Sequence, residues 1–157
     1  MNNKKKDRIF VEGNVVKHES AGGFLFFNDQ KDGLMVAIIK KIDDTFYMPK
    51  GHIKEGETPE QAATREIMEE LSLEVKPALI KKVGVNSYSF TLPNDSRKHF
   101  KKVHVYVFKV DKKVKIAPVK AEGFEDARWV TIQDASNLLA FDSKNLQKSK
   151  DVYLKFK

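Results

Sequence analysis

The stretch Gly51–Leu73 constrains the fold more than any other part of this chain, because it predicts a tight loop followed directly by a helix. Thr58 has a residue type favoured at a helix N-cap, and Pro59 suits the first helical position, where its missing N–H is not needed. Gln61 follows the cap by three residues, which is the spacing of a capping box. We therefore predict a helix that begins directly after Thr58.

The predicted helix has two distinct faces. Apolar residues recur at a spacing of four on one face: Ala63, Ile67 and Leu71. Acidic residues at spacings of three and four project together from another face: Glu66, Glu69 and Glu70. This pattern predicts that one side of the helix packs on a core while another side carries a cluster of carboxylates.

The acidic cluster has two interpretations. Like charges at this spacing repel by about 0.2–0.5 kcal/mol per pair, and a solvated helix face tolerates that cost. Alternatively, a hard divalent cation binds the carboxylate oxygens and converts the repulsion into coordination. We favour the cation, and magnesium is the natural candidate because it combines one or two carboxylates with waters and substrate phosphates.

The loop and helix together resemble the Nudix (MutT-like) box, in which a glycine, a glutamate and an Arg-Glu-apolar-x-Glu-Glu helix stand at fixed spacing. The matching positions are Gly51, Glu57, Arg65, Glu66, Ile67, Glu69, Glu70 and Leu73. Ser72 stands where the box has a second glycine. A glycine just past a helix end usually adopts the left-handed conformation, so a serine there costs about 1 kcal/mol, at a distance from the carboxylates.

This resemblance implies a magnesium-dependent hydrolase, with Mn²⁺ as a substitute metal. The implied metal ligands are the Gly51 carbonyl and the carboxylates of Glu66, Glu69 and Glu70. By the same resemblance, Glu69 or Glu70 orients or deprotonates the attacking water. Glu57 and Arg65 are expected to pair and to brace the loop against the helix.

A further carboxylate is implied near the end of the chain. In the family, an acidic segment shortly before a Trp-apolar strand supplies another metal ligand or a general base. Here Glu122 and Glu125 precede Trp129. Glu122 is the preferred candidate and Glu125 the alternative, and a solvated acidic loop is the other interpretation of both.

Two segments resemble the diadenosine polyphosphate hydrolase branch of the family. The Pro-Lys-Gly-His motif implies phosphate contacts for Lys50 and His52, although a loop histidine can also simply face water. Lys101 matches the phosphate-contacting lysine of a Lys-x-Val strand. The branch's aromatic residue falls on Val105 here, one residue before Tyr106, which therefore lies on the other strand face. The candidates for stacking on a purine are Tyr47, Tyr88 and Tyr106.

Strand and helix patterns alternate along the rest of the chain. Strands are predicted within residues 19–27, 34–39, 79–92 and 100–110, and helices at 132–140 and 142–157. Gly22 and Gly23 in the first strand predict close approach by a ligand or another backbone. In the last helix, the residues expected to pack on the body are Leu146, Val152 and Leu154. The order predicts α/β layering with a mixed sheet, and the resemblance specifies a Nudix-type α/β/α sandwich with a loop–helix catalytic motif.

The composition bounds the class of protein. A chain of 157 residues with 41% hydrophobic residues suits one domain over residues 1–157, with residues 1–8 expected to form a flexible tail. No cysteine, no membrane-length apolar run and no apolar stretch behind the basic N-terminus is present, which predicts a cytoplasmic protein. The formal charge of +7 indicates either attraction to polyphosphate or nucleic acid, or a general richness in lysine.

The favoured function is cleavage of a pyrophosphate bond in a nucleoside diphosphate linked to another group, above all in dinucleoside polyphosphates such as diadenosine tetraphosphate. The alternatives are a nucleoside triphosphate pyrophosphohydrolase and an enzyme that removes pyrophosphate from RNA 5′ ends. The contrasting class is a non-catalytic domain that senses a nucleotide. Loss of the acidic residues of the box would indicate that class, and here they are all present. The sequence indicates no membrane and no protein partner.

Overall fold

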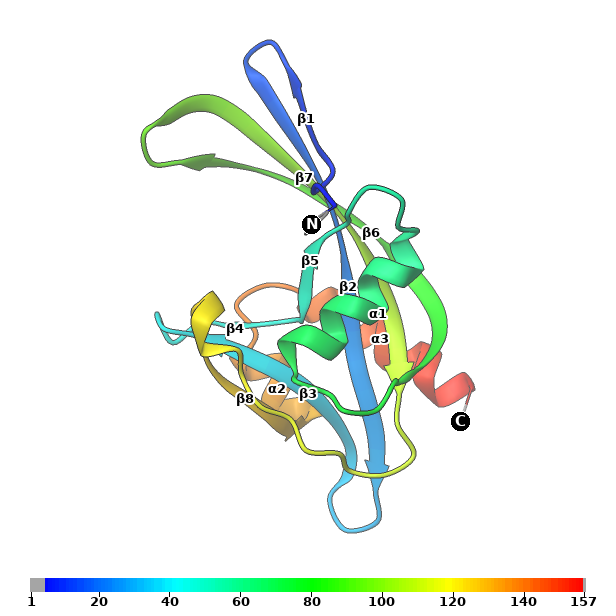
Figure 1. Ribbon diagram of the computed structural model, residues 1–157. Coiled ribbons are helices and arrows are strands. Elements are labelled where there is room, and N and C mark those ends of the chain that lie inside the picture. The colour runs from blue at the N-terminus through cyan, green and yellow to red at the C-terminus, as the bar shows by residue number, and fades with distance from the viewer. Residues whose placement is uncertain (1–4, 157) are drawn as a thin grey trace.

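The computed structural model describes residues 5–156 of the chain. Its centre is one mixed, eight-stranded sheet in which β4, β3, β2, β7 and β6 are neighbours, while β1 and β5 pair with β2 and β8 pairs with β3 (Figure 1). The strands are β1 (Ile9–Glu12), β2 (Val15–Asp29), β3 (Gly33–Lys41), β4 (Phe46–Tyr47), β5 (Lys50–His52), β6 (Ala78–Leu92), β7 (Asp95–Lys109) and β8 (Phe124–Thr131). The helices are α1 (Pro59–Glu70), the short 3₁₀ helix η1 (Lys120–Glu122), α2 (Ile132–Leu138) and α3 (Ser143–Lys155). Within the described range, none of these helices is long and apolar enough to cross a membrane.

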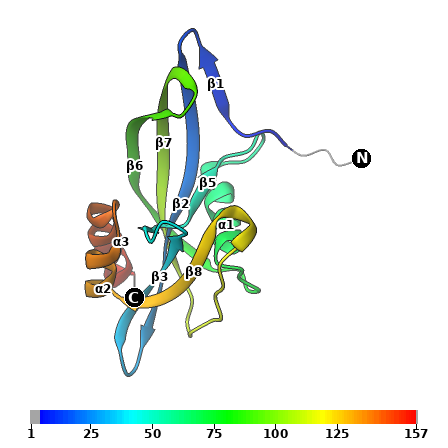
Figure 2. The ribbon, with the colours of Figure 1, turned by 90° about the vertical axis from the view of Figure 1, so that its left-hand side faces the viewer.

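Helices cover both faces of the sheet, which makes three layers. Figure 2 shows α1 on one side and α2 with α3 on the other. Each gap between layers holds its own hydrophobic cluster, one including Ala63, Ile67 and Leu71 from the α1 region, and one including Leu146 and Tyr153 from α3. The predicted α/β/α sandwich is therefore confirmed, and so is the predicted apolar stripe of α1.

Strand β7 supplies side chains to both clusters. Val103, Val105 and Val107 belong to the cluster beneath α2 and α3. Tyr106 and Phe108 point the other way and belong to the cluster beneath α1. This alternation follows from the period of two in a strand. It also determines which side chains of β7 reach the candidate substrate cleft.

The glycine pair in β2 allows two backbones to approach closely. A Cβ added at Gly22 would lie 2.1 Å from the Pro49 carbonyl oxygen, and one added at Gly23 would lie 1.9 Å from the Tyr106 carbonyl oxygen. Neither position accepts a side chain without a backbone shift. The predicted close approach is thus made by other parts of the chain, and it brings β5 alongside β2.

Two hairpin arms, β1–β2 and β6–β7, extend beyond the helices (Figure 1). Strands were predicted at 79–92 and 100–110, which fall on β6 and β7, whereas no strand was predicted at β1. The expected tail at residues 1–8 also differs from the structure: residues 1–4 lie outside the described range, while Asp7 forms a β-bridge with Lys54 and Arg8 donates to the Ile53 carbonyl. The N-terminal segment therefore contacts the loop that precedes α1.

The last helix differs from prediction by one position. Leu146 is fully buried and Val152 packs against the core, as predicted, but Leu154 is 48% exposed. Tyr153 is buried instead and stacks on Phe26 with ring centroids 5.3 Å apart. The apolar stripe of α3 thus ends on an aromatic residue rather than on the leucine beside it.

Candidate active site

The loop–helix segment forms as the sequence predicts. The Thr58 side chain accepts a hydrogen bond from the Gln61 backbone, and the Gln61 side chain accepts one from the Thr58 backbone, which completes the capping box. At the other end, Ser72 has φ 54° and so adopts the left-handed conformation usual for the glycine it replaces. Both ends of the helix are therefore defined by local chemistry, which fixes where the acidic side chains of α1 emerge.

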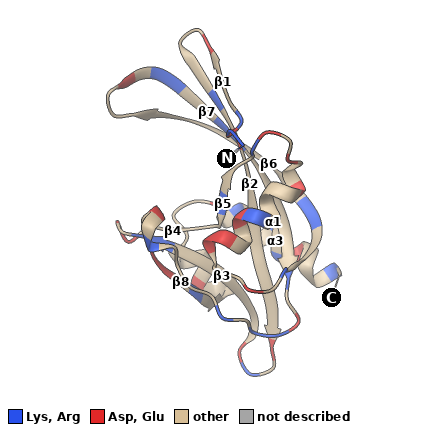
Figure 3. Ribbon diagram, viewed as in Figure 1, with Lys and Arg blue, Asp and Glu red and all other residues tan. Residues whose placement is uncertain are grey.

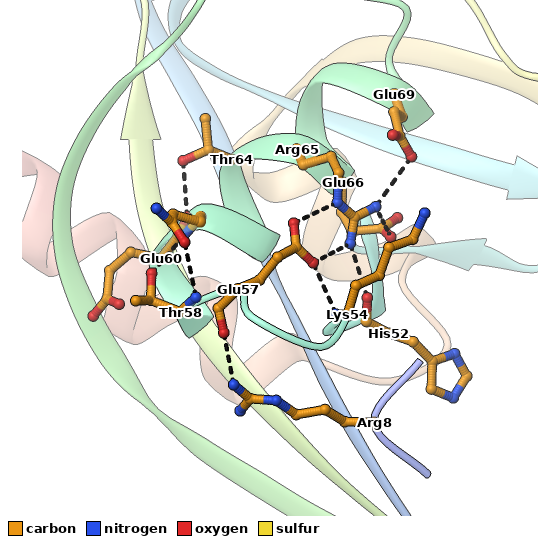
Figure 4. A network of polar contacts seen from close by, with 11 residues as sticks. Arg8, His52, Lys54, Glu57, Thr58, Glu60, Thr64, Arg65, Glu66 and Glu69 are labelled. Carbon is orange, nitrogen blue, oxygen red and sulfur yellow. Dashed lines mark hydrogen bonds and ion pairs between the residues drawn. The ribbon is translucent and has the colours of Figure 1, made fainter. Parts of the chain in front are cut away.

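Arg65 is the centre of the polar network beside α1 (Figure 4). Its guanidinium binds both carboxylate oxygens of Glu57, at 2.7 and 2.9 Å, which is the expected bracing pair. The same guanidinium donates to Glu66 at 2.7 Å, to Glu69 at 3.3 Å and to the His52 carbonyl at 2.9 Å. Arg65 lowers the pKa of the Glu57 carboxyl, so this loop glutamate remains ionised.

Two of the three helix acids are withdrawn from water. Glu70 is 5% exposed, and its carboxylate accepts a hydrogen bond from the Lys50 backbone at 2.9 Å. Burial and, to a smaller extent, the nearby Glu66 charge raise the pKa of Glu70 to about 8. Burial also raises the pKa of Glu66, against the opposing effect of Arg65. A cation beside these carboxylates would favour their ionised forms.

Gly51 lies directly against the Glu66 carboxylate. A Cβ at this position would be 2.2 Å from the Glu66 carboxyl carbon. Any other residue here would displace the acid, so this glycine is required by close packing rather than by a special backbone angle. The contact brings the loop and the helix acids to one place, as the proposed ligand set requires.

Glu122 lies near the same acids, at the end of η1. Its charge contributes to the raised pKa of both Glu66 and Glu70. Glu125 instead forms an ion pair with Lys40 at 3.5 Å. Figure 3 shows acidic positions both on α1 and at the η1 turn. The structure thus brings Glu122, the preferred candidate, toward the helix acids.

The donor set fits a hard divalent cation in its chemistry. Carboxylates and a backbone carbonyl are oxygen ligands, which magnesium and manganese accept. Between residues 5 and 156, however, no three His, Cys, Asp or Glu side chains converge as a ready metal cage. Arg65 holds Glu66 and Glu69, and Glu69 is half exposed. Arg65 contacts Oε1 of Glu66 and Oε2 of Glu69, so the second oxygen of each carboxylate is not held by Arg65 and is the one suited to a metal.

A cleft of about 780 Å³ opens on the sheet face opposite α1. Three lysines line it: Lys41, Lys50 and Lys101. Burial and, to a smaller extent, the charge of Lys50 lower the pKa of Lys101 to about 8. Since crowded, partly buried ammonium groups gain from a bound anion, the cleft suits a phosphorylated ligand.

Aromatic side chains stand in the same cleft in two pairs. Tyr47 and Phe141 have ring centroids 6.3 Å apart, and Tyr88 and Phe90 have centroids 6.1 Å apart. Lys41 lies 4.7 Å from the Tyr47 ring centre and Lys101 lies 5.6 Å from that of Phe90. Tyr47 and Tyr88 were named as stacking candidates, whereas Phe90 and Phe141 were not. The cleft thus offers flat apolar surfaces beside fixed positive charge.

Tyr106 is the clear correction among the candidate site residues. Its side chain is 1% exposed, and its hydroxyl donates to Glu60 at 3.2 Å on the α1 side of the sheet. A buried ring on the face opposite the cleft cannot stack on a base in that cleft. The prediction of a substrate-binding Tyr106 is therefore wrong, because strand alternation aims the residue at the core.

His52 lies outside the lining of the cleft and belongs to a chain of histidines. His18 Nδ1 lies 3.0 Å from His52 Nε2, at hydrogen-bonding distance. His18 Nε2 lies 2.8 Å from His99 Nδ1. His99 Nε2 lies 2.8 Å from an Asp95 carboxylate oxygen. A phosphate contact by His52 stays a prediction. No local sequence pattern marked His18 or His99, because their partners are distant in the chain.

The sandwich and its loop–helix geometry define a Nudix-type domain. Residues 16–151 match the family described as the NUDIX domain. The chain therefore belongs to the NUDIX domain family.

Comparisons with known proteins agree with this family. A Mycobacterium tuberculosis protein named as a mutator protein, MutT4, is 30% identical over 150 residues, covering 87% of this chain and 56% of that relative. The chain thus spans little more than half the length of that relative. An Ap4A hydrolase binary complex from C. elegans has a TM-score of 0.66 at 16% identity, over 89% of this chain and 99% of that chain. The E. coli dihydroneopterin triphosphate pyrophosphohydrolase has a TM-score of 0.63 at 19% identity, over 94% and 97% of the two chains.

Identities this low between solved structures show a shared fold. The family membership rests on the match to the NUDIX domain and on the relative from M. tuberculosis, and the structural neighbours add the shared fold.

Proposed function

We propose that this chain is a magnesium-dependent hydrolase that cleaves a pyrophosphate bond in a nucleoside diphosphate linked to another group, with dinucleoside polyphosphates as the favoured substrates. One observation carries the proposal: Lys50 joins the two halves of the site. Its side chain lines the basic cleft, while its backbone N–H donates to the buried Glu70 carboxylate. A phosphate chain held by the lysines therefore lies close to the acids.

The cleft residues bind and orient the substrate. Lys41, Lys50 and Lys101 are point charges suited to phosphate oxygens. The exposed rings of Tyr88 and Phe141 offer faces on which a nucleobase can stack. A volume of about 780 Å³ lies within the range of about 300–1,000 Å³ that is usual for small-molecule sites. Two aromatic pairs in one cleft favour a substrate with more than one stacking group.

The metal would be held by the Gly51 backbone carbonyl and by the carboxylates of Glu66, Glu69 and Glu70, with Glu122 as a further ligand. When bound, magnesium neutralises phosphate charge and lowers the pKa of a bound water, and Mn²⁺ can take its place. Glu57 and Arg65 keep the loop against the helix through their paired contacts.

The proposed reaction is attack of water on a phosphorus atom of the phosphate chain. A bond forms between the water oxygen and phosphorus, and the bond from that phosphorus to the bridging oxygen breaks. Glu69 or Glu70 accepts one proton of the water. Burial raises the pKa of Glu70 to about 8 in the metal-free protein, so Glu70 becomes a proton acceptor at neutral pH when a nearby cation favours its ionised form. Glu69 is more exposed to water and is the alternative acceptor.

Removal of pyrophosphate from RNA 5′ ends is the second candidate function. The formal charge of +7 favours a polyanionic substrate. The open cleft would admit the 5′ triphosphate in the same orientation. Nucleoside triphosphates would bind in the same way, and a nucleotide-sensing domain without turnover remains the non-enzymatic alternative.

Product analysis by anion-exchange chromatography tests these functions. The protein is incubated with magnesium and, separately, with diadenosine tetraphosphate, ADP-ribose, the nucleoside triphosphates and a triphosphorylated RNA. Rapid conversion of diadenosine tetraphosphate to ATP and AMP is the expected result. Pyrophosphate release from triphosphates or RNA, with the dinucleotide intact, would replace the favoured substrate. Magnesium-dependent binding of a nucleotide without any product would contradict an enzyme and support the sensor.

A further inference from the structure

We propose that the N-terminal segment Lys6–Arg8 is a strap that positions the catalytic loop, with Arg8 as its positioning residue. The inference rests on the proposed function, because the loop in question carries Gly51 and Glu57. It adds a role for residues that precede the Nudix box by more than forty positions. No pattern in the sequence assigns them to the site.

Backbone hydrogen bonds attach the strap to the loop. The Arg8 N–H donates to the Ile53 carbonyl at 2.7 Å, and the Glu55 N–H donates to the Lys6 carbonyl at 2.8 Å. Between them, Asp7 and Lys54 form an antiparallel bridge. The Arg8 carbonyl in turn accepts from the Glu19 N–H of β2 at 3.2 Å. The strap is therefore bonded both to the loop and to the central sheet.

The Arg8 side chain adds a second attachment (Figure 4). Its Nη2 donates to the Glu57 carbonyl at 2.7 Å, and its Nη1 lies 3.5 Å from a Glu19 carboxylate oxygen. Glu19 is itself held by His104 at 3.0 Å. A planar guanidinium with several donors can bind two acceptors at once, which a lysine ammonium on a flexible stem does less well. Arg8 thus ties the loop backbone to an anchored acid on β2.

The attachment continues from the loop to the metal-binding acids. Arg8 holds the backbone of Glu57, and the Glu57 carboxylate holds Arg65 through two hydrogen bonds. Arg65 then contacts Glu66 and Glu69. Since each member constrains the next, a shift of the loop at Glu57 is passed to the acids on α1. This gives Arg8 a role in catalysis without any contact to substrate.

A purely structural Arg8 would behave differently from a positioning residue. Loss of a structural contact lowers the unfolding temperature and leaves the folded enzyme's rate and metal affinity unchanged. Loss of a positioning contact loosens one loop, weakens metal binding and lowers kcat, while KM for the substrate barely changes because the lysine cleft lies on the other face. These two patterns can be separated by measurement.

The experiment compares Arg8→Ala, Arg8→Lys and a matched control, Lys17→Ala, in the chain of 157 residues. Lys17 forms an exposed ion pair with Glu12 on the same arm, at 3.0 Å, and does not touch the loop. Three quantities are measured well below each unfolding temperature: Mn²⁺ affinity of the substrate-free protein by calorimetry, amide hydrogen exchange, and kcat with KM for diadenosine tetraphosphate.

For Arg8→Ala we expect weaker Mn²⁺ binding and faster exchange of the amides of residues 54–57, each by roughly five- to tenfold, since one net hydrogen bond of this kind is lost. The amides inside α1 should exchange as in the parent. We expect kcat to fall by a similar factor with KM within about twofold, Arg8→Lys to be intermediate, and Lys17→Ala to match the parent.

Two results would overturn the inference. One is a lower unfolding temperature for Arg8→Ala with parental Mn²⁺ affinity and loop exchange. The other is an equal increase in exchange throughout α1 and the loop, which would mean global destabilisation. If the parent cleaves no substrate of the panel, the proposed function fails, and the Mn²⁺ and exchange measurements still decide the role of Arg8.

Discussion

Strand β5 separates two regions of opposite charge. On the α1 side, Glu66 and Glu70 are partly or fully buried, and burial raises the pKa of both. On the cleft side, Lys50 and Lys101 line one hollow, and burial lowers the pKa of Lys101 to about 8. Burial thus disfavours the charged forms of Glu66 and Glu70 in one region and of Lys101 in the other, and each region would gain from a bound ion of opposite sign.

The two regions differ in how firmly they are held. The acids are fixed by hydrogen bonds from Arg65 and from the Lys50 backbone. The cleft is walled by side chains that include Phe141, which is 67% exposed. Under the proposed function, this difference means that the firmly held acidic side specifies the chemistry, whereas the open basic side selects the substrate. A polyphosphate that carries a divalent cation would satisfy both regions at once.

The largest effect is expected from Glu70→Gln, which removes a charge from the acidic region while keeping its shape. Turnover should fall by orders of magnitude, because a neutral amide is a poor metal ligand and cannot accept the water's proton. The measurement is kcat on the best substrate of the panel. Glu125→Gln is the matched control, since Glu125 pairs with Lys40 away from the acids. Parental turnover of Glu70→Gln would remove the proposed mechanism.

The same variant should change the pH dependence of stability in the metal-free protein. The pKa of Glu70 is about 8 in the fold against 4.5 in an unstructured chain. A raised folded pKa gives stability that is fully present below pH 4.5 and is lost as the pH rises through about 8. Glutamine does not ionise, so the stability of Glu70→Gln should not fall as the pH rises through about 8. At pH 9 this variant should therefore unfold at a higher temperature than the parent. Identical pH profiles for both proteins would show that Glu70 is not the buried acid described.

Substitution of Lys101 tests the basic region. Lys101→Met should raise KM for a dinucleoside polyphosphate by about 10- to 100-fold, the usual range for loss of a charged hydrogen bond. Because Lys101 has a pKa of about 8, it loses its charge above that pH, so the parent KM should rise as the pH increases from 8 to 9. Lys101→Arg keeps the charge at all these pH values and should remove most of that rise. A parent KM that is flat over this range would contradict the assignment.

Removal of an aromatic wall should have a smaller effect. Base–aromatic stacking is worth about 1–3 kcal/mol, and the wide exposure of Phe141 places Phe141→Ala at the low end, about fivefold in KM. Phe156→Ala is a suitable control, because Phe156 is 55% exposed at the end of α3 and lies outside the cleft lining. Inorganic tripolyphosphate has no base, so its inhibition constant should be the same for both variants. A matching loss of tripolyphosphate binding would mean that Phe141 shapes the phosphate site instead.

The sequence predicted well those features whose partners are neighbours along the chain. The capping box of Thr58 and Gln61 depends on residues three apart, and the pairing of Glu57 with Arg65 depends on a fixed loop and helix. The alternation in β7 was also predicted, since it follows from strand geometry alone. Which of its two faces meets the cleft was not predicted, because both faces are buried and helices from elsewhere in the chain cover them. Tyr106 was assigned wrongly for that reason.

Features built from distant segments escaped prediction. Arg8 contacts Glu57 across 49 positions of sequence, and no local pattern marks it. The cleft similarly joins Lys41, Phe90 and Phe141 from three separate strands and loops. The residue types at such positions are common on protein surfaces, so the sequence does not mark them. Only the fold brings these residues together in one site. Local reasoning therefore finds the acidic region almost completely and the basic region only in part, through Lys50, Lys101, Tyr47 and Tyr88.

The smallest predicted effect concerns Ser72, which lies outside both charged regions. Its φ of 54° is a left-handed conformation that costs a non-glycine residue about 1 kcal/mol or somewhat more. Ser72→Gly should therefore raise the unfolding temperature by about 2–4 °C for a chain of this size, less whatever glycine loses by its greater freedom when unfolded. Calorimetric unfolding and kcat are measured together, and kcat should remain parental because the helix acids keep their positions. A changed kcat would show that the end of α1 is coupled to the acids, and the acidic region would then extend one turn further than the contacts of Glu66 and Glu70 indicate.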